Sequence, residues 1–211
     1  TVSDFFQEQF TSKLLNGVNC ALISAGAKSS GKSYSLFGKI PPASKASECS
    51  LPITDAGILP NVVCDLYHKM RSSNSTVSYT VKCSFVLVHL ERIIDLLGPQ
   101  PTGTETIFAR YSAGGLILDG ATESYCSEEE DVMDVIRRGK SFQSILSDAV
   151  SAKNDLLHTC FLLKVESSTG KRATLLLSEI FGFGATKKSN ALSYIAAGPH
   201  QRSSVALNRV V

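Results

Sequence analysis

The 211-residue sequence has no tryptophan, only two methionines, and no two cysteines in a Cys-x-x-Cys spacing. No apolar run approaches the ~18 residues of a membrane-spanning helix, and the chain does not open on a signal-peptide pattern. The formal net charge is only +2, which gives no reason to expect a nucleic acid or an anionic membrane surface as partner. These absences argue against a membrane protein, a nucleic-acid-binding protein and a paired-cysteine metal site.

The six cysteines are widely scattered, and three of them, Cys20, Cys83 and Cys160, lie inside apolar runs. A buried free thiol is the ordinary interpretation of such a position, so we expect reduced cysteines in an intracellular, soluble protein rather than a disulfide framework. An apolar fraction of 43% supplies enough material for a core and excludes a disordered or fibrous chain.

The apolar pattern predicts helices that alternate with strands. Helices are expected over 5–16, 32–37 and 59–70, and behind a Ser127–Glu130 capping box that opens a helix ending at 138–139. Strands are expected over 20–24, 77–90, 161–165 and 173–177, with two short ones within 106–118 and a short helical turn at 93–97. The wholly apolar run 20–24 is typical of a strand buried on both faces. This alternation favours a three-layer α/β fold.

One motif carries strong chemistry: Gly26-Ala27-Lys28-Ser29-Ser30-Gly31-Lys32-Ser33, which fits G-x-x-x-x-G-K-[ST] between a predicted strand and helix. Glycines let backbone N–H groups converge on a phosphate, and the helix N-terminus adds the positive end of its dipole. We expect Lys32 to reach the β and γ phosphates and the Ser33 hydroxyl to ligate Mg²⁺. The alternative is a flexible Gly/Ser loop that merely ends the strand.

Segments in the same order resemble the kinesin motor domain family. They are Leu15–Ile23, Gly31–Gly38, Gly57-Ile58-Leu59-Pro60, Phe85–Leu97 and the helix ending at Arg138-Gly139. The resemblance implies a three-layer P-loop NTPase sandwich of kinesin-motor type, with a mixed central sheet and helices on both faces. It also implies ATP or ADP with Mg²⁺ bound at Gly26–Ser33 and Tyr34, microtubules as partner, and a place in the cytoplasm on the cytoskeleton.

The family's switch I, N-x-x-S-S-R-S-H, falls on residues 151–158, where His158 alone matches. Asn154 and Asp155 stand where the family has serines that help to hold Mg²⁺ and the attacking water, and Leu156 replaces an arginine. An alternative alignment, shifted by a few residues, lets Ser147 or Ser151 serve instead.

Switch II, D-L-A-G-S-E in kinesins, falls on residues 179–184. Gly182 matches, and Glu179 keeps the carboxylate on a side chain one methylene longer. Gly184 replaces the glutamate that pairs with the switch I arginine in the family, so both ends of that bridge are missing. The stretch 180–183 is closer to the switch II of myosins, which we keep as a minor alternative. We expect slow hydrolysis, because phosphoryl transfer depends on positioned charges and a positioned water.

The C-terminal stretch 189–211 resembles a shortened form of the family's microtubule-facing helices. A modest basic face is expected from Lys187, Lys188, Arg202 and Arg209; the alternative is an ordinary solvated patch. The resemblance predicts a single partial motor domain over 1–211, with the family's first strand before Thr1 and its neck after Val211. The oligomeric state is then set outside this chain.

Other candidate sites are weaker. His68, His89 and His200 have no cysteine or carboxylate partners at metal spacing, and the acidic run 128–131 suits the first turn of a helix. The leading hypothesis is a nucleotide-binding, microtubule-associated motor head with weakened hydrolysis. The competing hypothesis is a non-motile scaffold that retains the fold without nucleotide.

Overall fold

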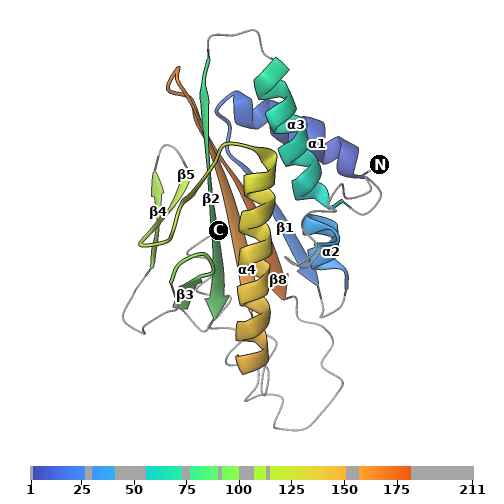
Figure 1. Cartoon of the computed structure of the whole chain (residues 1–211), viewed down its shortest axis with the longest axis vertical. Coiled ribbons are helices and arrows are strands. Elements are labelled where there is room, and N and C mark those ends of the chain that lie inside the picture. Colours follow the sequence, from blue (N-terminus) through green and yellow to red (C-terminus); the bar gives the residue numbers. More distant parts are fainter. Residues whose placement is uncertain are drawn as a thin grey trace.

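The computed structural model describes residues 2–26, 30–40, 56–72, 77–89, 92–99, 107–112, 115–150 and 157–181. A mixed sheet forms the centre of the molecule (Figure 1). Its strands lie in the order β1 (Cys20–Gly26), β8 (Arg172–Phe181), β7 (His158–Ser167), β2 (Tyr79–His89) and β3 (Arg92–Asp95), with β6 (Ser124–Cys126) also paired to β2. β1 runs parallel to β8, and the other neighbours are antiparallel.

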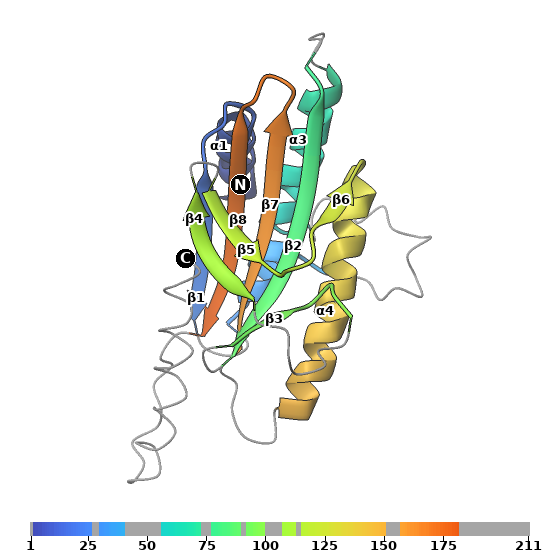
Figure 2. The same ribbon diagram turned by 90° about the vertical axis from the view of Figure 1, so that its left-hand side faces the viewer.

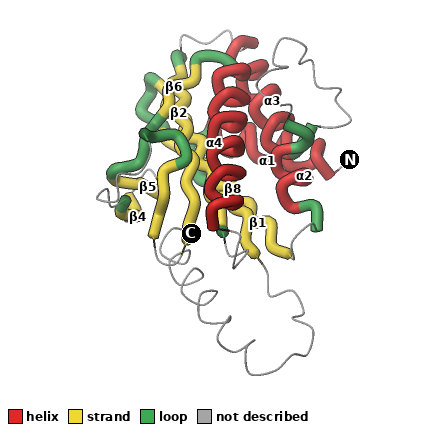
Figure 3. Tube along the Cα trace, turned by 60° about the horizontal axis from the view of Figure 1, so that its bottom comes forward, coloured by secondary structure: helices red, strands yellow, loops and turns green. Residues whose placement is uncertain are grey.

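The described helices all pack on one face of this sheet, as Figure 3 shows. They are α1 (Val2–Leu15), α2 (Lys32–Phe37), α3 (Ile58–Ser72) and α4 (Glu129–Val150). Alternation along β2 and β7 turns Phe85 and Phe161 toward the helices, where both rings meet Phe37 of α2 at centroid distances of 5.8 and 6.3 Å. This aromatic cluster joins α2 to the middle of the sheet.

The opposite face is covered by a hairpin of β4 (Phe108–Ser112) and β5 (Gly115–Asp119), which crosses β8 and β7 in Figure 2. Leu116 and Leu118 of the hairpin pack there with Leu162 of β7 and Leu176 of β8. The predicted α/β class with a mixed sheet is confirmed. The sequence also predicted helices on both faces; within the described residues the second face carries this hairpin instead.

Three details of the sequence prediction were wrong, and the first concerns the strand that begins at Cys20. β1 is not buried on both faces: it lies at the sheet edge with alternate residues exposed, and the Ile23 side chain is 44% exposed. Among the described residues, the hairpin's apolar cluster draws on β2, β7 and β8 but not on β1, so the hairpin does not bury the outer face of β1.

The second wrong detail is the helical turn expected at 93–97. Residues 92–95 form strand β3, antiparallel to the end of β2. The Asp95 carboxylate then accepts hydrogen bonds from the backbone N–H groups of Leu97 at 2.8 Å and Thr122 at 2.6 Å. This side chain closes the turn that a helix was expected to make.

The third concerns α4, which opens on a different cap and runs further than expected. The Asp131 carboxylate, rather than Glu130, accepts from the backbone N–H groups of Ser127 at 2.7 Å and Glu128 at 3.0 Å. Gly139 does not end the helix, which continues to Val150. A Cβ at Gly139 would lie 2.2 Å from Phe85 Cδ1, so this glycine permits close packing of α4 on β2.

The remaining predicted helices and strands are confirmed, with ends that differ by at most four residues. No helix in the described ranges combines the length and apolarity needed to cross a bilayer. Among the described cysteines, Cys20, Cys64, Cys83, Cys126 and Cys160 all carry free thiols.

Candidate functional site

The predicted phosphate loop connects the edge strand β1 to helix α2. β1 ends at Gly26 and α2 begins at Lys32. Gly31 precedes the helix with φ 88° and ψ 8°, in the left-handed region that glycine adopts at low cost, and its carbonyl accepts the first helical hydrogen bond from Ser35 N–H at 2.8 Å. The strand and the helix that this motif requires on its two sides are therefore present.

The Lys32 side chain points back toward the end of β1. It is 9% exposed, and its Nζ donates a hydrogen bond to the Gly26 carbonyl oxygen at 2.9 Å. A Cβ at Gly26 would lie 2.7 Å from Ser30 Oγ, so the absence of a side chain lets the two ends of the loop approach. Ser33 and Tyr34, in the first turn of α2, are exposed. The ammonium group is thus held at the end of β1, and the two residues that follow Lys32 on α2 are exposed to solvent.

The far end of α2 is tied to the start of α3 by two glycines. Gly38 forms a β-bridge with Ala56, and a Cβ at Gly57 would lie 2.3 Å from the Gly38 nitrogen. Gly57 therefore has to be a glycine for the two segments to touch. This contact fixes the direction of α2, and with it the position of Lys32.

The Glu179 carboxylate lies near the end of β8, on the strand next to the loop. The parallel register pairs Ser24 with Glu179 and Gly26 with Phe181, so β8 ends where the phosphate loop starts. Glu179 follows Ala173, Leu175 and Leu177 at a spacing of two, which turns it to the helix face. Its side chain is 7% exposed.

Both carboxylate oxygens of Glu179 are engaged. Lys140 Nζ of α4 lies 3.2 Å from Oε1 and 3.1 Å from Oε2, and the Thr159 hydroxyl donates to Oε2 at 3.1 Å. The Lys140 ammonium also lies 4.2 Å from the Phe37 ring centroid, a cation–π distance. We call Lys140, Glu179 and Thr159 the Glu179 cluster.

Burial and the Glu179 carboxylate have opposite effects on the pKa of Lys140. The Lys140 side chain is 16% exposed, and this burial lowers the pKa of Lys140 from its ordinary value, while the Glu179 carboxylate opposes the shift. A buried charge pair of this kind is held together because separating it leaves a buried charge without a counter-charge.

The nucleotide and Mg²⁺ that the resemblance implies fit one half of this site. Lys32 and Ser33 present an ammonium and a hydroxyl at the start of α2, the donor set that a phosphate and its metal require. Glu179 does not fit, because its charge is already neutralised by Lys140. Within the described ranges, no three His, Cys, Asp or Glu side chains gather into a metal site.

The remaining predicted site residues are divided between the described and the undescribed parts of the chain. His158 opens β7, is fully buried, and pairs with Val88 of β2. The predicted site residues that lie outside the described residues are Ala27, Lys28, Ser29, Asn154, Asp155, Gly182, Lys187, Lys188, Arg202 and Arg209.

Sequence reasoning missed Lys140 and Thr159. A signal for Lys140 exists: the residue follows the buried Val132 and Ile136 at intervals of four, so it continues the inward stripe of α4. A lysine on such a stripe indicates a buried cation that needs a partner. No comparable signal marks Thr159, because its role depends on the register of β7 with β8.

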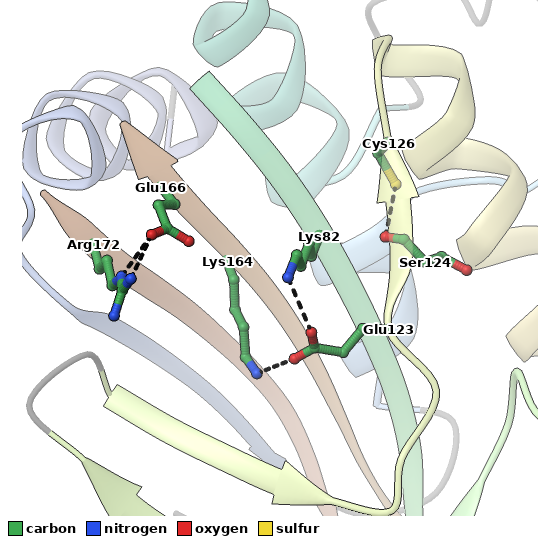
Figure 4. A network of polar contacts seen from close by, with 7 residues as sticks. All are labelled: Lys82, Glu123, Ser124, Cys126, Lys164, Glu166 and Arg172. Carbon is green, nitrogen blue, oxygen red and sulfur yellow. Dashed lines mark hydrogen bonds and ion pairs between the residues drawn. The ribbon is translucent and has the colours of Figure 1, made fainter. Parts of the chain in front are cut away.

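A second charged cluster lies on the hairpin face, where Figure 4 shows it. Glu123 bridges Lys82, at 3.6 Å, and Lys164, and we call these three residues the Glu123 cluster. Burial alone would raise the pKa of Glu123, but the two ammonium groups lower it below its ordinary value. The cluster lines a cavity of about 230 Å³ beside the Glu166–Arg172 ion pair.

The positions of the three residues indicate that the Glu123 cluster has a structural role. Lys82 and Lys164 are paired on the adjacent strands β2 and β7, and Glu123 lies in the connection between β5 and β6. The ion pairs thereby tie this connection to the sheet.

Comparison with known proteins identifies the family. The kinesin motor domain matches residues 1–193. The chain is 27% identical to a kinesin heavy chain of Botryotinia fuckeliana, over 90% of this chain and 21% of that protein, and 26% identical to kinesin-like protein 3 of Schizosaccharomyces pombe, over 91% and 34%. The chain thus spans about a fifth to a third of these relatives.

Solved structures agree with this assignment. A structure reported as "Structure of a fast kinesin: Implications for ATPase mechanism and interactions with microtubules" matches with a TM-score of 0.72 and 25% identity. The match covers 98% of this chain and 55% of that one. With a family match over 193 of its 211 residues, this chain belongs to the kinesin motor domain family.

Proposed function

We propose that this chain is a kinesin-type head that binds ATP or ADP through residues 26–34 and turns ATP over slowly. The observation that carries the proposal is that Lys32, the first residue of α2, reaches back to the end of β1, where its Nζ lies 2.9 Å from the Gly26 carbonyl oxygen. A phosphate is a stronger partner for this ammonium than a backbone carbonyl, because both groups are charged. Nucleotide binding then exchanges the Gly26 contact for a phosphate contact.

Slow turnover is the second part of the proposal. Glu179, the carboxylate that corresponds to the family's switch II acid, is engaged by Lys140 and Thr159. The sequence also offers Leu156 and Gly184 in place of an arginine and a glutamate, so no ion pair is available there to close the two switches. Removing one preorganised group from such a site commonly costs ~10²–10³ in rate.

Association with microtubules, and a place on the cytoskeleton, are proposed from family membership together with the basic residues of the C-terminal stretch. Lys187, Lys188, Arg202 and Arg209 provide a few positive charges for an acidic polymer. Contacts of this kind weaken as salt screens them, so co-sedimentation is expected to be weak and to decline across a salt series. Tight binding that survives high salt would contradict this part.

Nucleotide binding is tested by isothermal titration of the full-length protein with ATP and ADP. Lys32→Ala is expected to abolish the heat of binding, whereas Lys13→Ala, which removes an exposed lysine from α1, is expected to leave it unchanged. No binding of either nucleotide to the folded protein would overturn the proposal. That result would favour a scaffold that retains the motor fold, the function to which the closed Lys140–Glu179 contact is also suited.

A further inference from the structure

The Lys140 ammonium engages the Glu179 carboxylate, the residue that falls on the family's switch II acid. Lys140 Nζ lies within 3.2 Å of both Glu179 oxygens, and the Thr159 hydroxyl donates a further hydrogen bond to Glu179 Oε2 at 3.1 Å. The Glu179 charge is thus met by a protein cation. A second, divalent cation brought to the same carboxylate would be repelled by the ammonium beside it.

The ammonium is also held where it is. The Phe37 ring lies 4.2 Å from Lys140 Nζ, the Phe85 ring lies 5.7 Å away, and the side chain is 16% exposed. Because Gly139 has no side chain, α4 packs directly on Phe85. This close packing brings Lys140, the next residue, near the sheet. If Lys140 swung out to solvent, it would leave a buried carboxylate without a counter-charge, a costly arrangement.

We infer that Lys140 withholds Glu179 from Mg²⁺, so that this head binds nucleotide with little dependence on the metal. The inference rests on the proposed nucleotide binding at the phosphate loop and adds a specific role for a residue of α4. Lys140 is a positioning residue: it touches Glu179, and it acts on the nucleotide site only through that carboxylate. The Ser33 hydroxyl then remains the one metal ligand expected from the described part of the loop.

The experiment measures the affinity of the full-length protein for a fluorescent ADP analogue in excess Mg²⁺ and in EDTA. For the unmodified protein the two values are expected to agree within about threefold. In Lys140→Met the carboxylate is released, and Mg²⁺ is expected to strengthen binding by about tenfold, the effect of one charge-assisted hydrogen bond. The double variant Lys140→Met/Glu179→Gln is expected to lose this gain, because the charged acceptor is gone.

A matched control is available on α3. Lys69 forms a 2.8 Å ion pair with Asp65, so Lys69→Met also breaks a lysine–carboxylate contact but at another place, and it is expected to leave the Mg²⁺ dependence unchanged. Thermal unfolding checks that each variant is folded. If Lys140→Met does not fold, Lys140→Gln replaces it, because a neutral amide can still donate to one Glu179 oxygen.

Each outcome decides one claim. Strong Mg²⁺ dependence in the unmodified protein, unaltered in Lys140→Met, overturns the inference and leaves nucleotide binding standing. Equal affinities with and without Mg²⁺ in every variant also overturn it, because Lys140 is then not the cause. A loss of all binding in the folded, unmodified protein overturns the proposed function itself, and this inference with it.

Discussion

The Glu179 cluster and the Glu123 cluster both combine lysine with glutamate, but they are buried to different degrees. In the Glu179 cluster, Lys140 and Glu179 are 16% and 7% exposed on the helix face. In the Glu123 cluster, Lys82, Lys164 and Glu123 are 27%, 23% and 34% exposed on the hairpin face. Solvent therefore reaches the side chains of the second cluster more readily than those of the first. A lysine–glutamate pair therefore has very different consequences at the two places.

The two clusters also lie near opposite ends of strand β8. Arg172 begins β8 beside the Glu123 cluster, and Glu179 lies seven residues later, about 20 Å along the strand. The later end is the one that adjoins the phosphate loop. The exposed cluster ties a connection to the sheet, whereas the buried one stands where the nucleotide chemistry of the family is expected.

The largest expected effect comes from breaking the buried pair. Lys140→Met leaves Glu179 charged and buried, and we expect it to lower the free energy of unfolding by about 3 kcal/mol. The double variant Lys140→Met/Glu179→Gln is expected to recover most of this loss. Urea denaturation measures both, and a loss in the single variant as small as that in Lys82→Met would contradict the contrast between the clusters.

The next effect concerns the glycine that brings α4 onto the sheet. Alanine normally favours a helix over glycine, but at Gly139 its Cβ would meet Phe85 Cδ1 at 2.2 Å. Gly139→Ala is therefore expected to destabilise the protein by about 2 kcal/mol, measured by the same denaturation. Ser141→Ala, at an exposed position of α4, is the control and should be neutral or slightly stabilising.

The exposed cluster should yield a smaller and salt-dependent effect. Lys82→Met is expected to cost less than about 1 kcal/mol at low ionic strength, and the cost should shrink when salt is added. The matched measurement on Lys140→Met should change little with salt, because its pair is buried. Equal salt dependence in the two variants would show that the clusters do not differ as their exposure suggests.

The smallest effect is on acid stability. The folded-state pKa of Glu123 is lowered from 4.5 by Lys164 and Lys82, so the unfolded chain binds more protons there. The contribution of Glu123 to stability is therefore fully present above pH 4.5 and is lost as pH falls through the folded-state pKa. Glu123→Gln is expected to flatten this part of the stability–pH curve, as followed by chemical denaturation; an unchanged curve would contradict the role of the two lysines.

Much of the fold could be predicted from local pattern. The helices α1, α2 and α3 and the strands of the β7–β8 hairpin follow the apolar periodicity of their own residues. The exposure of β1 could not be predicted, because it depends on which strands the β4–β5 hairpin covers. The strand at 92–95 was also missed, since its conformation is set by pairing with β2 rather than by its own sequence.

Part of the candidate site could also be predicted from the sequence, and part could not. The phosphate loop is a contiguous motif, so Gly26, Gly31 and Lys32 could be named from the sequence. The partners of Glu179 could not, because Lys140 and Thr159 lie 39 and 20 residues away and meet the carboxylate only through tertiary packing.

We propose that this chain combines a nucleotide-binding phosphate loop with a Glu179 carboxylate that is held by Lys140. Steady-state phosphate release by the full-length protein, with and without microtubules, tests the claim most directly. We expect slow release that microtubules accelerate only slightly, because Lys140 holds the Glu179 carboxylate and because Leu156 and Gly184 cannot form an ion pair. Release that microtubules strongly accelerate in the unmodified protein would contradict it and make this chain part of an active motor.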